Sequence, residues 1–62
     1  MLLLSYPEQL EMMSKELKVD LLDAIKLAEI PTSTYYRSVK GDMNLRHTTA
    51  ERIAHAIVEL SA

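Results

Sequence analysis

The chain has 62 residues, carries nine acidic and seven basic side chains for a formal net charge of −2, and contains no cysteine. So short a chain is expected to form one small domain over residues 1–62, because it cannot bury two cores. The absence of cysteine excludes a disulfide framework and a thiolate metal site. The abundance of Leu, Met and Ala, without Phe or Trp, favours an all-α fold.

The first four residues, MLLL, form a short apolar run. They have no basic flank and no small-residue cleavage site, and Ser5 and Pro7 follow almost at once. We therefore expect neither a signal peptide nor a membrane span. The lack of cysteine and of a targeting signal favours the reducing cytoplasm.

The first predicted helix begins after Ser5 and runs to about Leu17. Ser5 followed by Glu8 is typical of a capping box, and Pro7 is tolerated in the first turn because its missing N–H needs no partner there. Apolar residues recur at spacings of three and four and predict one buried stripe. They are Leu10, Met13 and Leu17.

The second predicted helix has Asp20 as its N-cap and Asp23 in its first turn, where a negative charge is favourable. It should end near Ala28 or Glu29, because Pro31 disfavours helical geometry in the residue before it. Apolar side chains surround most of this helix, which is typical of a central, buried element. They are Leu21, Leu22, Ala24, Ile25, Leu27 and Ala28.

The third predicted helix begins at Thr32 or Ser33, where hydroxyl side chains suit a helix cap. Gly41 is expected to end it in a left-handed conformation. Tyr35 and Val39 lie four residues apart and are expected to face inward. The residues expected to face outward are Tyr36, Arg37 and Lys40.

A polar loop is predicted over residues 42–47, with Met43 or Leu45 filling the core. Residues 48–51 (TTAE) predict a second capping box, and the final helix should run to about Leu60. Its predicted stripe consists of Ala50, Ile53, Ile57 and Leu60, widened by Ala54 and Val58.

The charge is distributed unevenly along the chain. Residues 1–30 hold six acidic and three basic side chains, whereas residues 31–47 hold three basic and one acidic. The basic excess coincides with the third predicted helix. A local excess of this kind favours a polyanionic partner even though the chain as a whole is acidic.

The third helix carries side chains that suit the DNA major groove. Base edges offer hydrogen-bond donors, acceptors and the thymine methyl group. Thr32 and Ser33 are short and polar, Arg37 can bond guanine O6 and N7 with its planar fork, and Tyr36 can bond a phosphate or pack on a base methyl. Lys40, Arg46 and the N–H groups at helix starts suit phosphate contacts.

A plainer interpretation of the same residues stays open. Arg37 and Lys40 are then ordinary solvated charges, and Thr32 and Ser33 only cap the helix. Tyr36 is then packed on the surface.

Residues 28–37 read AEIPTSTYYR and are followed by Gly41. This stretch resembles the helix-turn-helix of phage repressors of the lambda repressor/Cro type, in which a common run is apolar-Gly-Val-Ser-x-Ser-Thr-apolar-x-Arg with a closing glycine. Tyr35 falls on the family's core position. The resemblance covers Ile25 to about Leu60, since residues 49–57 (TAERIAHAI) are similar to the helix packed beneath the motif. The direct matches are Ser33, Thr34, Arg37 and Gly41.

The resemblance implies a lambda repressor-like bundle of four to five helices that binds a double-stranded operator as a homodimer and represses transcription, in a bacterial or phage-infected cell. The helix at about residues 32–40 would enter the major groove. The implied base contacts are Thr32, Ser33, Tyr36 and Arg37, and the implied backbone contacts are Lys40, Arg46 and Thr34.

Two positions depart from the family pattern. Glu29 stands where glycine is usual, so a positive φ there would cost of order 1 kcal/mol. Pro31 stands where a capping Ser or Thr is usual, which leaves Thr32 as the expected cap.

Other functions find less support in the sequence. There is no nucleophile with a neighbouring base and no Gly-rich phosphate loop, so we expect no enzyme, no cofactor and no small-molecule ligand. His47 and His55 are too few for a structural metal site, and Glu51, His55 and Glu59 share one helix face as an ion pair or surface patch. The apolar excess of residues 1–4 and of the final helix favours a homodimer; the plainer alternative is a satisfied core with a frayed N-terminus. Two alternatives stay open: a protein-binding antirepressor or adaptor that does not bind DNA, and an antitoxin-like repressor.

Overall fold

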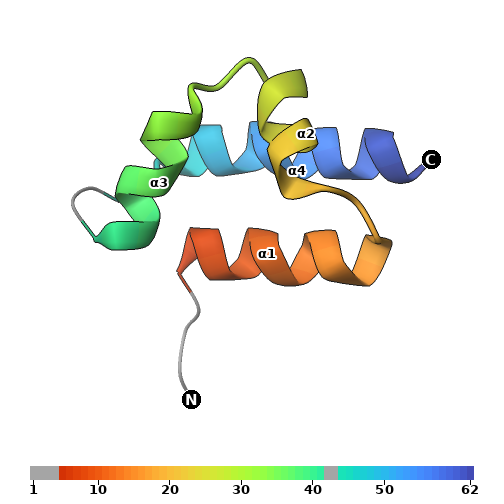
Figure 1. Ribbon diagram of the computed structural model, residues 1–62, viewed down its shortest axis with the longest axis horizontal. Helices are drawn as coiled ribbons and strands as arrows, with labels where there is room; N and C mark the ends of the chain where they lie inside the picture. The colour runs from red at the N-terminus through yellow and green to blue at the C-terminus, as the bar shows by residue number, and fades with distance from the viewer. Residues whose placement is uncertain (1–4, 42–43) are drawn as a thin grey trace.

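The computed structural model describes residues 5–41 and 44–62. This part of the chain contains four helices and no strand, so the all-α prediction is confirmed. The helices are α1 (Tyr6–Leu17), α2 (Leu21–Leu27), α3 (Thr32–Lys40) and α4 (His47–Ser61) (Figure 1). None of the described helices is long and apolar enough to cross a membrane.

Two long helices form the base of the fold. Helices α1 and α4 pack against each other and run in the same direction, α2 packs on α4, and α3 lies at one end against α1 and α2 (Figure 1). One buried cluster joins all four helices and the loop before α4, and it includes Leu45, as predicted. The alternative core residue, Met43, lies outside the described residues. The largest fully buried side chains are Ile25, Ile53 and Ile57.

Two of the predicted helix caps are confirmed. The Ser5 side chain accepts a hydrogen bond from the Glu8 N–H at 3.4 Å. The Asp20 carboxylate accepts one from the Leu22 N–H at 2.9 Å. Each satisfies an N–H group that the first turn of a helix leaves without an intrahelical partner.

The capping box predicted at residues 48–51 is wrong. Helix α4 begins at His47, with Arg46 in the N-cap position and no side-chain cap bond. Thr48 and Thr49 are therefore already helical, and a residue with helical backbone angles cannot act as an N-cap.

Helix α2 is less buried than predicted. Ala24 and Ile25 are fully buried, but Leu22 and Leu27 are exposed. The helix has seven residues and lies at the surface of the bundle, so its partners cover one side only. Apolar side chains around most of α2 therefore did not indicate that the helix is central and buried.

The predicted stripes are also wrong near the helix ends. Leu17, Val39 and Leu60 were expected to be buried, and all three are exposed, as is Val58. Helical periodicity identifies the face that turns toward a partner, but it does not say where that partner ends. Small residues of the same faces are buried instead, namely Ser14 in α1 and Ala56 in α4.

Candidate nucleic-acid interface

The turn between α2 and α3 has a defined hydrogen-bond pattern. The Glu29 N–H donates to the Lys26 carbonyl at 3.0 Å, and the Ile30 N–H donates to the Ile25 carbonyl at 3.2 Å. These two bonds constitute a Schellman motif. Ile25 and Ile30 are both buried in the core and supply the apolar contact that usually accompanies this motif.

Glu29 adopts the left-handed conformation that this motif requires, with φ of 60°. The sequence left the sign of φ at this position open, and the structure shows it to be positive. A side chain with a Cβ atom is strained there by of order 1 kcal/mol relative to glycine. The burial of Ile30 and the two backbone bonds offset this strain.

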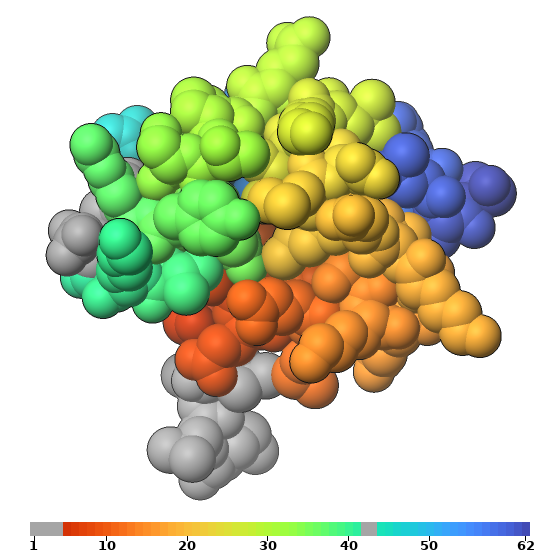
Figure 2. All heavy atoms as spheres, viewed as in Figure 1, coloured from red at the N-terminus to blue at the C-terminus, as the bar shows by residue number. Residues whose placement is uncertain are grey.

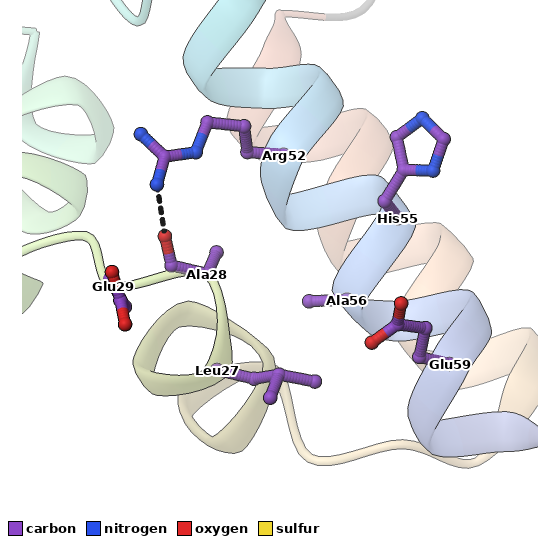
Figure 3. Close-up of a pocket in the computed structure, with 7 residues that line it drawn as sticks. All are labelled: Leu27, Ala28, Glu29, Arg52, His55, Ala56 and Glu59. Carbon is purple, nitrogen blue, oxygen red and sulfur yellow. Dashed lines mark hydrogen bonds between the residues drawn. The ribbon is translucent and has the colours of Figure 1, made fainter.

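Arg52 reaches the same turn from α4. Its Nη2 donates to the carbonyl oxygen of Ala28 at 3.0 Å (Figure 3). Ala28 is the C-cap of α2, and carbonyl groups at a helix C-terminus lack intrahelical partners. A guanidinium group there is also favoured by the helix dipole. Sequence reasoning missed this contact, because nothing local links residues 24 positions apart.

A shallow pocket lies beside this contact, between the end of α2 and one face of α4 (Figure 3). Its lining is partly apolar and partly charged. The lining residues are Leu27, Ala28, Glu29, Arg52, His55, Ala56 and Glu59.

Helix α3 starts without a side-chain cap. Pro31 occupies the N-cap position, and its carbonyl accepts from the Thr34 N–H at 3.0 Å. The expectation that Thr32 caps the helix is wrong, because Thr32 is itself the first helical residue. Among the described residues the hydroxyl groups of Thr32, Ser33 and Thr34 have no hydrogen-bond partner, so they are available to a ligand.

Tyr35 anchors α3 to the core, as predicted. Tyr35 is only 4% exposed. Its hydroxyl donates a hydrogen bond to Glu11 Oε1 of α1 at 3.1 Å. Burial, followed by the charge of Glu11 and this hydrogen bond, raises the pKa of Tyr35 well above its usual value. The Tyr35 and Tyr36 rings meet edge to face, with centroids 5.9 Å apart.

The opposite face of α3 is open to solvent. Ser33, Tyr36, Arg37 and Lys40 line one surface hollow, and their spacing of three and four residues places them on one side of the helix. Tyr36 is 49% exposed. In Figure 2 the side chains of α3 (green) form one end of the visible surface.

Arg37 and Lys40 have no ion pair or side-chain hydrogen bond in the part of the chain that the structure describes. Helix α3 contains no acidic residue, so the positive charge of this face is not neutralised within the helix. An unpaired basic side on an exposed helix suits contact with a polyanion.

The remaining predicted contacts lie nearby in the chain but not in this hollow. Thr32 and Thr34 are half-buried, and the residues lining the hollow do not include them. Arg46 is exposed at the start of α4. The structure therefore brings together three of the four predicted base contacts, Ser33, Tyr36 and Arg37, with the predicted backbone contact Lys40.

His47 takes part in a chain of polar contacts at the start of α4. Its Nδ1 lies 2.9 Å from the Tyr6 hydroxyl, and its Nε2 lies 3.0 Å from Glu51 Oε1. His47 is thus helical and not a loop residue, and Glu51 pairs with it and not with His55. Over residues 5–41 and 44–62, no three His, Cys, Asp or Glu side chains are grouped so that they could hold a metal ion.

Comparison with known proteins returned no family: no protein-family model, no curated protein and no solved structure matches this chain. The functional interpretation therefore rests on the geometry of α2, the turn and α3.

Proposed function

We propose that this protein binds double-stranded DNA sequence-specifically, with α2 and α3 acting as a helix-turn-helix and α3 as its recognition helix. The observation that carries the proposal is the open face of α3. It presents a hydroxyl, a phenol, a guanidinium and an ammonium group that have no acidic partner in the described part of the chain. A recognition helix needs short polar side chains near its start and longer donors one turn later.

Each side chain of this face has a role in the proposed complex. Arg37 bonds guanine O6 and N7 in the bidentate geometry of its fork. Ser33 and Tyr36 contact neighbouring base edges, and Thr32 does so from the first turn. Phosphate contacts, which hold the register, come from Lys40, Arg46 and Thr34.

The proposed biological role is that of a Cro-type repressor that occludes its operator as a homodimer. Two recognition helices then enter successive major grooves about 34 Å apart. The described part of one chain measures 31 × 29 × 17 Å, so two copies side by side have the size to span that distance. The proposal assigns no enzymatic activity and no cofactor.

Selection of bound duplexes from a random library, followed by footprinting, tests the proposal. We expect one recovered motif with two-fold symmetry, half-sites one helical turn apart, and affinity that falls as salt is raised. Failure to enrich any motif, with no binding at low salt, would contradict it.

Two substitutions then separate base contacts, which give sequence specificity, from phosphate contacts, which give general affinity. Arg37→Ala should cost about 1–3 kcal/mol of binding free energy and relax the preference at one base pair. Lys40→Ala should weaken binding to all sequences alike and reduce the salt slope by about one unit. A folded Arg37→Ala variant that binds its selected duplex unchanged would remove α3 from the interface.

A protein-interaction module is the second candidate, because residues 1–30 are acidic and several apolar side chains are exposed in α1 and α2. These are Met12, Leu17, Leu22 and Leu27. An antirepressor or adaptor of this kind would show no salt-sensitive duplex binding and would instead form a stoichiometric complex with a protein. An antitoxin-like repressor shares the DNA mechanism and would pass the same tests.

A further inference from the structure

Helix α3 has no direct backbone contact with the longest helix of the fold. It packs against α1 and α2, whereas within the described residues no Cα atom of α3 comes within 8 Å of one in α4. Helix α4 therefore acts on the direction of α3 through side chains of the shared core and through the neighbouring elements. The α2–α3 turn is the element that directly precedes α3.

One hydrogen bond links α4 to that turn directly. Arg52 Nη2 donates to the Ala28 carbonyl at 3.0 Å, one residue before the strained Glu29 (Figure 3). No described backbone N–H donates to this carbonyl oxygen, so Arg52 supplies a donor that the helix end lacks. Hydrogen bonds with one ionised partner are the stronger kind.

Arg52 makes no other hydrogen bond or ion pair within the described residues. It makes no ion pair with Glu29 or Glu59, although both line the pocket beside it. Its single partner among the described residues is the Ala28 carbonyl, and its position on α4 is held by the buried Ile53 and Ala56. The guanidinium group thus joins α4 to the turn from which α3 begins.

We propose that Arg52 is a positioning residue that holds the α2–α3 turn and thereby aims the Ser33–Lys40 face of α3. This inference deepens the proposed DNA-binding function and rests on it for its binding readout. Without the bond, α2 and α3 remain helical, but the angle between them is less restricted. A looser recognition helix loses discrimination between sequences before it loses general attraction to phosphate.

The test compares Arg52→Met, which keeps an unbranched apolar stem without donors, with Arg52→Lys, which keeps the charge and one donor group. Lys15→Met is the control for the loss of an exposed cation elsewhere, since Lys15 lies in the last turn of α1. Circular dichroism establishes that each variant is folded at the temperature used. Amide ¹⁵N spectra of the free proteins then report on the turn without DNA.

In the free protein, Arg52→Met should shift the amide signals of Ala28, Glu29 and Ile30 and of α3, and should speed hydrogen exchange at Ile30. Arg52→Lys should shift them less, and Lys15→Met should leave them unchanged. A folded Arg52→Met protein with wild-type signals in the turn and α3 would overturn the proposal, whether or not the protein binds DNA.

With the duplex selected by the wild-type protein, Arg52→Met should reduce the ratio of specific to nonspecific affinity roughly tenfold, which is the scale of one lost charge-assisted hydrogen bond. The salt slope should stay at the wild-type value, and Arg52→Lys should recover most of the ratio. A slope smaller by about one unit would instead mean that Arg52 contacts a phosphate, and that result would overturn the positioning role. If the wild-type protein selects no duplex, the proposed function fails, while the spectra still decide whether Arg52 holds the turn.

Discussion

The two junctions on either side of α2 have the same backbone conformation, but different side-chain contacts stabilise them. At the end of α1, Lys18 is left-handed with φ of 56°, and the Lys18 and Val19 N–H groups donate to Lys15 and Ser14. At the end of α2, Glu29 takes the equivalent place with φ of 60°. Both junctions are Schellman motifs, and neither has the glycine that usually accepts the left-handed conformation.

The two junctions differ in the side-chain contacts that stabilise them and in the helix that follows. The first junction has the polar Ser14 opposite the half-buried Val19, and it leads to a helix with a well-formed Asp20 cap. The second has the buried pair Ile25 and Ile30 plus the Arg52 bond, and it leads to an uncapped helix. Helix α2 is therefore started by its own local sequence, whereas α3 is held by tertiary contacts, which leaves its first-turn hydroxyl groups without protein partners.

The largest expected effect is at the apolar contact of the second junction. Ile30→Ala should lower the free energy of unfolding by about 2–4 kcal/mol, because a buried isoleucine is truncated. Val19→Ala, the equivalent change at the first junction, should cost about 1 kcal/mol, since Val19 is half-buried and loses less. Urea titrations measure both. Equal losses would mean that the two junctions are supported alike.

Tyr35 is the second support of α3, and Tyr35→Phe should cost about 1–1.5 kcal/mol through loss of the hydrogen bond to Glu11. The raised pKa of Tyr35 also gives the stability a pH dependence. Its contribution is complete below a pH of about 10, the value for an unfolded tyrosine, and is lost as the pH rises through the higher folded-state pKa.

Stability measured from pH 8 to above 10 should therefore fall in the wild-type protein and fall less in Tyr35→Phe. Tyr36→Phe is the matched control, because it removes an exposed phenol from the next position. If the two variants have the same alkaline profile, ionisation of Tyr35 is not what lowers the stability at high pH.

The caps of α2 and α3 should respond differently to alanine. Asp20→Ala should cost about 1 kcal/mol, because the Leu22 N–H loses its acceptor. Thr32→Ala should change stability by less than about 0.5 kcal/mol, because its hydroxyl caps nothing. A loss at Thr32 as large as that at Asp20 would show that α3 is capped by its own sequence after all.

The smallest expected effect is a gain. Lys18→Gly and Glu29→Gly should each raise the free energy of unfolding by about 0.5–1 kcal/mol, because relief of left-handed strain exceeds the extra chain entropy of glycine. Thermal melts of the single and double variants test whether the gains add. A loss at Glu29 alone would indicate that its side chain contributes to the turn.

Local chemistry allowed much of this fold to be predicted. The bounds of α1, α2 and α3, the caps at Ser5 and Asp20, and the stop at Gly41 all follow from residues within a turn of each other. The family resemblance identified residue 29 as the usual glycine position but did not fix its φ, which the structure shows to be positive. The outward face of α3 was predicted from two inward anchors, Tyr35 and Val39, of which only Tyr35 is buried.

The errors concern contacts between distant segments. Burial at Leu17, Val39 and Leu60 depends on how far the neighbouring helices extend, which periodicity cannot show. The Arg52 bond to Ala28 depends on how α4 lies against the turn. The failed caps at Thr32 and Thr48–Thr49 have one cause: these residues were expected to precede their helices, but α3 begins at Thr32 itself and α4 begins at His47.

The most direct test of the proposed interface is an amide ¹⁵N titration of the protein with its selected duplex. We expect the largest signal changes at residues 33–40 and at the start of α4, and little change at the first junction, Lys18–Asp20. Changes that spare α3 and centre on the exposed apolar residues of α1 and α2, or no change at low salt, would contradict the assignment of α3 as the DNA-reading helix.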